Sequence, residues 1–239
     1  MCNIWQSEDS EDLDAGALAR LPDSLRYINI SGGEPFLHRD LPELTGAIVK
    51  ACPKAQIIIS TNGLVSARRV REDMARIREL SPGAGIAVSI DGMGETHDRI
   101  RDIKGAFDRA MELIEGLKAD GMTNLRIAFT LVDENVKDYY EVYQLSRRLG
   151  IEYTSAVAQG SEHYFQGTGM RPAAEADIRR QLEKVAAGEL ASFTPKAGPG
   201  PTSTAVSIPS PAVVAGRYPA RPPMTSFSSV PLVPFMPVT

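Results

Sequence analysis

Five short apolar runs alternate with longer helical patterns between residues 27 and 157, and this alternation limits the possible folds more than any other feature. The runs begin 27 to 39 residues apart, which is the length of one βα unit. Continuous apolar runs of this kind are typical of strands buried on both faces of a parallel sheet. Two architectures satisfy the pattern, a (β/α) barrel and an open doubly wound sheet. The five runs are Tyr27–Ile30, Ile57–Ile59, Ile86–Ile90, Leu125–Leu131 and Glu152–Val157.

The segments between these runs carry apolar residues at helical spacing. A helix is predicted after Ser66, a suitable N-cap, because apolar residues recur there at spacings of four, three and three. Residues 107–117 repeat the pattern, and a further helix is predicted over 135–149, ended by Gly150 as a typical C′ residue. A last helix, Ala174 to Glu189, is expected to pack on the outside of the sheet.

Composition and charge exclude several functional classes. The net charge of -4 and a pI near 5.5 provide no broad basic surface, so neither nucleic acid nor an anionic membrane is an expected partner. No apolar run approaches the roughly 20 residues of a membrane span, and the acidic segment Ser7–Asp12 is unlike the start of a signal peptide. The two cysteines, Cys2 and Cys52, form no disulfide framework. We therefore expect a soluble, cytoplasmic protein.

The composition changes abruptly after Glu189. Residues 190–239 contain 11 of the 17 prolines and no Asp or Glu, although the chain has 30 acidic residues in all. Proline at this density breaks helices and strands, so we expect this tail to be disordered. A proline-rich partner ligand and a frame-shifted end remain alternatives. The predicted organisation is a core over 1–160, a connecting segment and helix over 161–189, and the tail over 190–239.

Compact polar residues follow three successive predicted strands. Because the carboxyl ends of parallel strands meet at one edge, these groups are expected to form a site for a small polar ligand. Two glycines in the first group would let a ligand approach the backbone closely. The groups are Ser31-Gly32-Gly33-Glu34-Pro35, Ser60-Thr61-Asn62-Gly63, and Ser89 with Asp91.

Other interpretations exist for each of these residues. The Gly-Gly and Asn62-Gly63 pairs also occur in ordinary turns, and Ser89 or Asp91 could cap the following helix. His38 and His97 could bind a metal with Glu34, as in a barrel metallohydrolase. No metal-binding histidine spacing supports this, so capping or surface roles are favoured for the histidines.

The ordered motifs resemble those of the radical S-adenosylmethionine (SAM) enzymes. The resemblance extends from Met1 to about Gln159 and rests on Ser31–Pro35, Ser60–Gly63 and Val88–Gly92, with His97–Arg101 following. It implies a partial (β/α)6 TIM-like barrel. It also implies a 4Fe-4S cluster on a C-x3-C-x2-C loop, which cleaves SAM reductively to a 5′-deoxyadenosyl radical that abstracts hydrogen from a substrate.

The resemblance also implies roles for individual residues. Cys2, in the context Cys-Asn-Ile-Trp, corresponds to the third cluster cysteine. The triplet Gly32, Gly33 and Glu34 corresponds to the motif that holds the methionyl amine of SAM. Ribose and carboxylate contacts would come from Ser89 and Asp91, with Ser60 and Asn62 adjacent and Arg101 as a further candidate for the carboxylate.

One departure from the family pattern concerns the cluster. The resemblance places the first strand and two cluster cysteines before Met1, so we expect a fragment that by itself neither holds a stable cluster nor generates the radical. The complete enzyme would act on an unknown substrate with an external electron donor such as flavodoxin or ferredoxin. A non-catalytic relative that binds a small molecule is the alternative.

Overall fold

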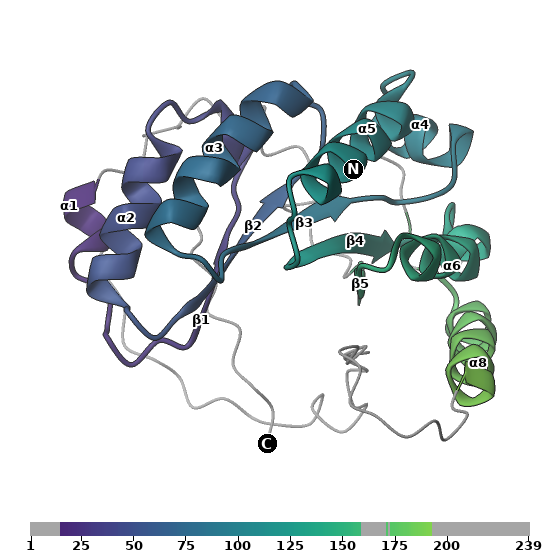
Figure 1. The fold of residues 1–239 in the computed structure, drawn as a ribbon. Helices are drawn as coiled ribbons and strands as arrows, with labels where there is room; N and C mark the ends of the chain where they lie inside the picture. The colour runs from purple at the N-terminus through teal and green to yellow at the C-terminus, as the bar shows by residue number, and fades with distance from the viewer. Residues whose placement is uncertain (1–14, 159–170, 172, 193–239) are drawn as a thin grey trace.

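The computed structural model describes residues 15–158, 171 and 173–192 (Figure 1). Its five strands form one parallel sheet in chain order, and neighbouring strands are in register, so that Ile59 lies opposite Ile86 and Ile86 opposite Leu125. This order lacks the reversal that defines a doubly wound sheet and is that of a barrel. The strands are β1 (Tyr27–Ile30), β2 (Gln56–Thr61), β3 (Gly85–Ser89), β4 (Leu125–Leu131) and β5 (Glu152–Val157).

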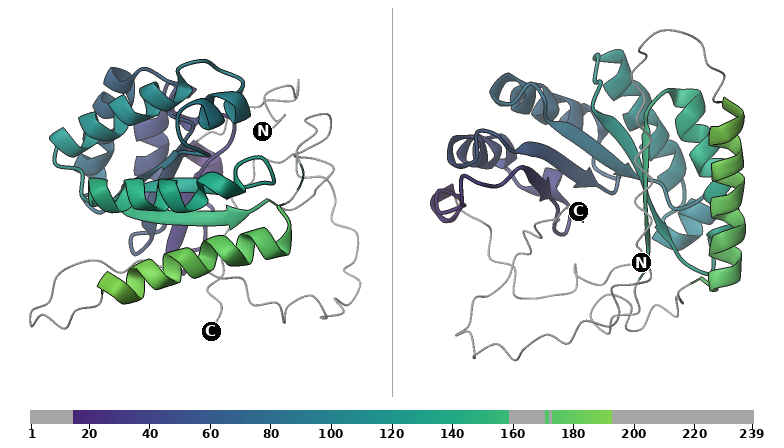
Figure 2. Two further views of the ribbon diagram at one scale, coloured as in Figure 1. Left: turned by 90° about the vertical axis from the view of Figure 1, so that its right-hand side faces the viewer. Right: turned by 90° about the horizontal axis from the view of Figure 1, so that it is seen from below.

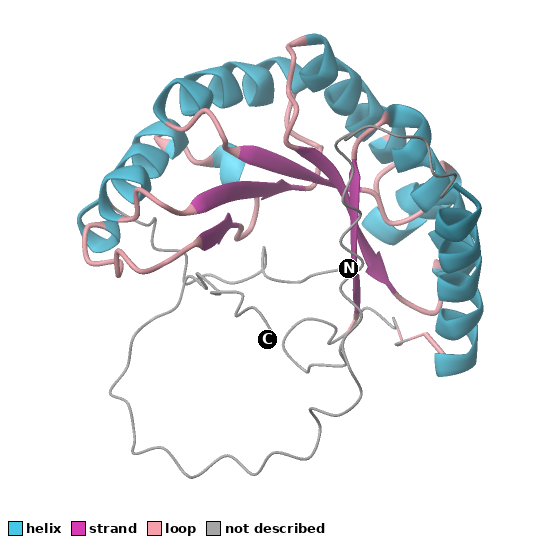
Figure 3. Cartoon of the chain, turned by 60° about the horizontal axis from the view of Figure 1, so that its bottom comes forward, coloured by secondary structure: helices cyan, strands magenta, loops and turns pink. Residues whose placement is uncertain are grey.

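The helices lie outside the curved sheet, so the strands form the inside of an arc (Figures 2 and 3). This arrangement confirms the expected partial barrel over an arc of five strands. Three short helices sit at the carboxyl ends of strands: η2 (Pro35–Leu37), α4 (Glu95–Arg101) and η3 (Val136–Asp138). The others are α1 (Ala15–Leu18), α2 (Leu41–Ala51), α3 (Ala67–Leu80), α5 (Ala106–Ala119), α6 (Tyr139–Leu149) and α8 (Glu175–Ser192).

The two faces of the sheet differ in chemistry because successive strand residues point to opposite sides. Side chains on the convex face pack against the helices in one continuous apolar core. They include Ile57, Ile59, Ile86, Val88, Leu125, Ile127 and Phe129. Their neighbours along each strand face the inside of the arc and are mostly small or polar. These are Asn29, Ile58, Ser60, Ala87, Ser89, Arg126, Ala128, Thr130, Thr154 and Ala156.

Local signals in the sequence account for the helix ends. The Ser66 hydroxyl accepts a hydrogen bond from the Arg69 amide at 3.4 Å, as an N-cap does. Gly150 ends α6 in the left-handed conformation with φ of 67°. The helix predicted over 135–149 begins later, at Tyr139, because η3 precedes it.

The last described helix extends beyond its predicted end. α8 continues through Ser192 rather than stopping at Glu189, since no proline interrupts the chain before Pro195. It packs against α6, and the Tyr143 hydroxyl donates a hydrogen bond to Glu189. Residues 193–239, most of the predicted disordered tail, lie outside the described residues. So do residues 159–170, which span the end of the predicted core and the start of the predicted connecting segment.

Among the described residues, no helix is both long enough and apolar enough to cross a membrane.

Candidate functional site

The carboxylate of Glu34 joins the carboxyl ends of β1 and β2. Its Oε1 accepts hydrogen bonds from the Thr61 hydroxyl at 2.8 Å and from the Phe36 amide at 3.3 Å. Its Oε2 accepts one from the Asn62 amide at 2.8 Å. Three donors of the chain therefore fix the orientation of Glu34. Since an ionised carboxylate has about four acceptor positions, Oε2 retains one for a ligand.

The electrostatic environment of Glu34 suits a cationic ligand. Burial raises the pKa of Glu34 above its usual value, while the three hydrogen bonds and the positive charge of Arg101 oppose this effect. A positively charged group next to the carboxylate would also favour its ionised form. The contacts place Arg101 at the same end of the sheet as Glu34. Its guanidinium is bonded to Asp91, which follows β3, and β3 is the neighbour of β2, whose end Glu34 joins.

The two glycines before Glu34 border open space. A Cβ atom added at Gly32 or Gly33 would meet no heavy atom of the described residues within 4 Å. A ligand would therefore have room to approach the backbone at these two glycines, and their role in ligand binding stays a prediction.

Ser60 and Asn62 already make hydrogen bonds within the chain. The Ser60 hydroxyl donates to Asn29 Oδ1 at 2.9 Å, which links β2 to β1. Asn62 Oδ1 accepts from the Leu64 amide at 2.8 Å, the arrangement of an Asx turn. The turn interpretation of Asn62 is therefore correct. Both residues adjoin Thr61, which binds Glu34, and each side chain already makes a hydrogen bond within the chain.

Asp91 lies at the centre of a buried network after β3. Its side chain is fully buried, Oδ1 accepts from the Thr130 amide at 2.8 Å, and Oδ2 accepts from the Arg101 guanidinium. The Asp91 carbonyl accepts from Asn135 Nδ2 at 2.9 Å. Asp91 does not cap α4, whose N-cap is Gly94. Both its carboxylate oxygens are used to join the ends of β3 and β4 to α4.

His97 belongs to the same network. Its Nδ1 accepts from the Asp91 amide at 2.9 Å, so the neutral ring carries its proton on Nε2. Burial, and secondarily the charge of Arg101, lower the pKa of His97 to about 4. The next residue, Asp98, accepts from the amides of Gly105 and Phe107 and thereby connects α4 to the start of α5.

Ser89 faces the inside of the arc, opposite Ala128 of β4. It is partly exposed, and its hydroxyl makes no hydrogen bond within the described part of the chain. Of the two serines predicted for the site, Ser60 already bonds Asn29, whereas the Ser89 hydroxyl has no hydrogen-bond partner among the described residues.

The remaining cysteines and histidine are not joined to this group by any bond that the described residues make. Cys2 lies outside the described residues. Cys52 is buried before β2, at the opposite end of the sheet, where its thiol donates to the Pro22 carbonyl at 3.2 Å. His38 accepts from the Asp40 amide through Nδ1. Within residues 15–158, 171 and 173–192, no three His, Cys, Asp or Glu residues are grouped to hold a metal, so the metallohydrolase alternative gains no support.

Three residues that build the site received no role of their own from the sequence, namely Thr61, Thr130 and Asn135. Thr61 belongs to the predicted polar group that follows β2, and its hydroxyl donates to Glu34. Asn135 was placed at the start of a helix, and Thr130 acts through its backbone amide, which no side-chain pattern reveals. The one signal in the sequence was an asparagine shortly after a predicted strand.

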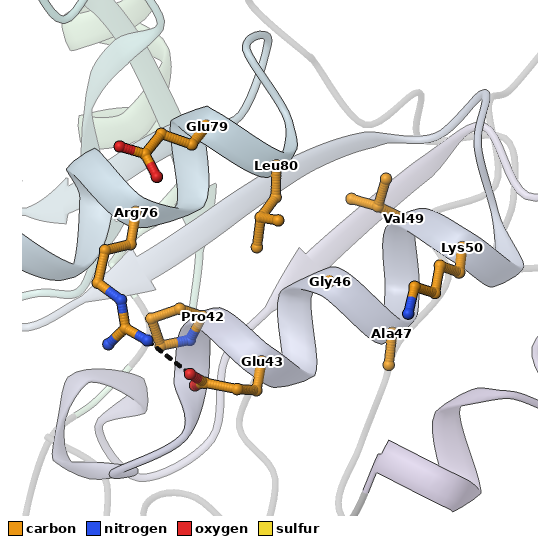
Figure 4. A pocket seen from close by; sticks show the side chains of 9 residues that line it. All are labelled: Pro42, Glu43, Gly46, Ala47, Val49, Lys50, Arg76, Glu79 and Leu80. Atoms are coloured by element: carbon orange, nitrogen blue, oxygen red, sulfur yellow. Dashed lines mark hydrogen bonds and ion pairs between the residues drawn. The ribbon is translucent and has the colours of Figure 1, made fainter.

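A hollow of about 610 Å³ lies elsewhere, between α2 and α3 on the outer helical layer (Figure 4). Arg76 and Glu43 form an ion pair across it, and Leu80, with 47% of its surface exposed, points into it. None of the predicted site residues lines this groove.

Comparisons with known proteins agree with the fold and the motifs. The family model described as Radical SAM superfamily matches residues 4–146. Fe-coproporphyrin III synthase of Methanosarcina barkeri is 34% identical over 118 residues, which cover 49% of this chain and 28% of that protein. Mycofactocin maturase MftC of Mycolicibacterium smegmatis is 31% identical over 125 residues, covering 52% of this chain and 30% of the maturase.

A solved structure supports the same fold. Coproporphyrinogen III oxidase (HemN) from Escherichia coli, described as a radical SAM enzyme, matches with a TM-score of 0.52 and 11% identity, over 70% of this chain and 40% of that one. The chain thus spans less than half the length of each of these relatives, and all three have enzyme names. Because the family model covers more than half of the sequence, the chain belongs to the radical SAM superfamily, a family of enzymes.

Proposed function

We propose that the carboxyl ends of β1 to β4 bind SAM, in an enzyme that uses a 4Fe-4S cluster to cleave SAM reductively and abstract hydrogen from a substrate. The observation that carries the proposal is that an acidic residue, Glu34, and a basic residue, Arg101, lie at the same end of the sheet. Glu34 is bonded to the end of β2, and Arg101 is bonded to Asp91 after the neighbouring β3. The methionyl end of SAM carries an ammonium and a carboxylate, which match these two groups in sign.

The available hydrogen-bonding capacity suggests how the ligand would be held. The open backbone at Gly32 and Gly33 and the unused position on Glu34 Oε2 are acceptors for the ammonium. Arg101 is the donor for the carboxylate, and the uncommitted Ser89 hydroxyl suits the ribose. Ser60 and Asn62 shape the wall beside Glu34. Asp91, with both carboxylate oxygens occupied, would act by holding Arg101 rather than by direct contact.

The cluster and its partners are part of the same proposal. Cys2 is proposed as one cluster ligand, and the bound cluster would supply the electron that cleaves SAM. An external donor such as flavodoxin or ferredoxin would reduce the enzyme. Cubane clusters are held by several thiolates, and Cys52 is buried at the other end of the sheet. The decisive experiment therefore concerns SAM, whose proposed contacts all lie within the described residues.

The test measures SAM binding to the 239-residue chain by isothermal titration calorimetry. We expect Glu34→Ala and Arg101→Gln each to weaken binding about tenfold, the usual cost of one charge-assisted contact. Matched controls are Glu43→Ala and Arg76→Gln, which change an acid and a base on the outer helices and should leave the affinity unchanged. Absence of SAM binding by the unmodified chain, or equal losses in all four variants, would refute the proposed function.

A further inference from the structure

We infer that Asn135 is a positioning residue that fixes Arg101 for recognition of the ligand carboxylate. This inference rests on the proposed function and extends it to a residue that contacts neither the ligand nor Arg101. It depends on three successive links, from Asn135 to Asp91, from Asp91 to Arg101, and from Arg101 to the carboxylate.

The side chain of Asn135 is fully buried and joins the ends of two strands. Nδ2 donates to the Asp91 carbonyl at 2.9 Å and to the Thr130 carbonyl at 2.8 Å, while Oδ1 accepts from the Val132 amide at 2.8 Å. Asn135 precedes η3, where an asparagine usually caps the helix, but its side chain makes no capping bond. Its hydrogen-bonding capacity is directed entirely toward β3 and β4.

These bonds immobilise Asp91 at several points. Its carbonyl is held by Asn135, its amide by His97, and its Oδ1 by the Thr130 amide. Asn135 also binds the Thr130 carbonyl, so it fixes both strand ends between which the Asp91 carboxylate lies. The remaining oxygen of Asp91 is thereby set in one position.

Arg101 takes its orientation from that oxygen. Asp91 is its one hydrogen-bond partner among the residues the structure describes, and 18% of the Arg101 side chain is exposed. Only Nη2 of Arg101 is used in the bond to Asp91, and the guanidinium is partly exposed, so an anionic oxygen could accept a hydrogen bond from its free N–H groups. A guanidinium held in this way loses less conformational freedom on binding, which strengthens recognition of a carboxylate.

The test compares two ligands that differ only in the carboxylate, SAM and decarboxylated SAM. In the unmodified chain, SAM should bind more tightly, and Arg101→Gln should abolish most of that preference. Asn135→Ala is expected to reduce the preference about tenfold while changing the affinity for decarboxylated SAM less than twofold. Asn135→Ser, a smaller perturbation, should act in the same direction.

Asn124→Ala is the matched control. Asn124 precedes β4 at the opposite end of the strand and donates to the Gly83 carbonyl, so its removal should leave the preference intact. Equal weakening of both ligands by Asn135→Ala, as a purely structural role or a folding defect would cause, overturns the inference. So does an unchanged preference in both Asn135 variants. If the unmodified chain binds neither ligand, the proposed function fails and this inference fails with it.

Discussion

His97 shows how burial determines the chemical form of a single side chain. The ring accepts a hydrogen bond from the Asp91 amide, lies on the same short helix as Arg101, and is fully buried. A protonated ring could not accept that bond and would place a second positive charge beside the guanidinium. Neutral His97 is therefore part of the structure that holds the strand ends, which explains why neither a metal-binding nor a surface role fits it.

Stability should depend on pH through His97. Its pKa is about 4 in the folded chain and near 6.5 when unfolded, so the unfolded chain binds the proton more readily. The stabilisation is complete above pH 6.5 and is lost as the pH falls toward 4. Between pH 6.5 and 5 we expect the free energy of unfolding to fall by about 2 kcal/mol from this residue.

The measurement is urea unfolding at several pH values in the unmodified chain and in His97→Asn. Asparagine can accept the bond from the Asp91 amide but does not titrate in this range. The variant should be less stable at pH 7, and its free energy of unfolding should change less between pH 6.5 and 5. If the free energy of unfolding changed equally with pH in the two proteins, His97 would not be the group responsible.

At the scale of elements, the sequence predicted the regular parts well and the connections poorly. The five strands and the helix after Ser66 followed from apolar spacing and a cap, because each element buries one repeating face. The polar groups after β1, β2 and β3 were also found. The short helix α4 was not predicted. Nor were the links through Asn135, because they join residues 44 apart in sequence.

The turn after β2 packs closely against α5, and a substitution at Gly63 measures how much this contact matters. Gly63 has φ of 74°, and a Cβ there would lie 3.0 Å from the Ala110 Cβ of α5. Gly63→Ala should therefore lower the free energy of unfolding by about 3 kcal/mol, through backbone strain and overpacking together. Gly150 has φ of 67° but no atom within 4 Å of an added Cβ, so Gly150→Ala should cost about 1 kcal/mol. If chemical denaturation showed the same loss of unfolding free energy in Gly63→Ala and Gly150→Ala, the contact of Gly63 with α5 would be unimportant.

At the scale of the whole molecule, the sheet is not uniformly supported. β3 is paired on both sides and four of its five residues are buried. β1 has four residues, one of them buried, and pairs within the described structure only with β2. Local opening should therefore be easier at β1 than in the middle of the arc.

Hydrogen exchange followed by mass spectrometry tests this gradient. Peptides covering β3 and β4 should be the slowest to exchange, and peptides covering β1 should exchange at least tenfold faster, because fewer buried contacts must break to expose them. Peptides from α3, which packs against the centre of the arc, serve as a slow internal reference. Protection of β1 equal to that of β3 would mean that the sheet opens only as a single cooperative unit.

The different chemistry of the two sheet faces has a consequence for how such a chain can diversify. Nearly all the apolar burial lies on the convex side, while residues such as Ala128, Thr154 and Ala156 on the concave side are partly or largely exposed. Replacing these small side chains would alter what fits inside the arc at little cost to folding. Descendants of one ancestral scaffold could therefore acquire new substrates through a few interior substitutions, without first acquiring compensating mutations in the core.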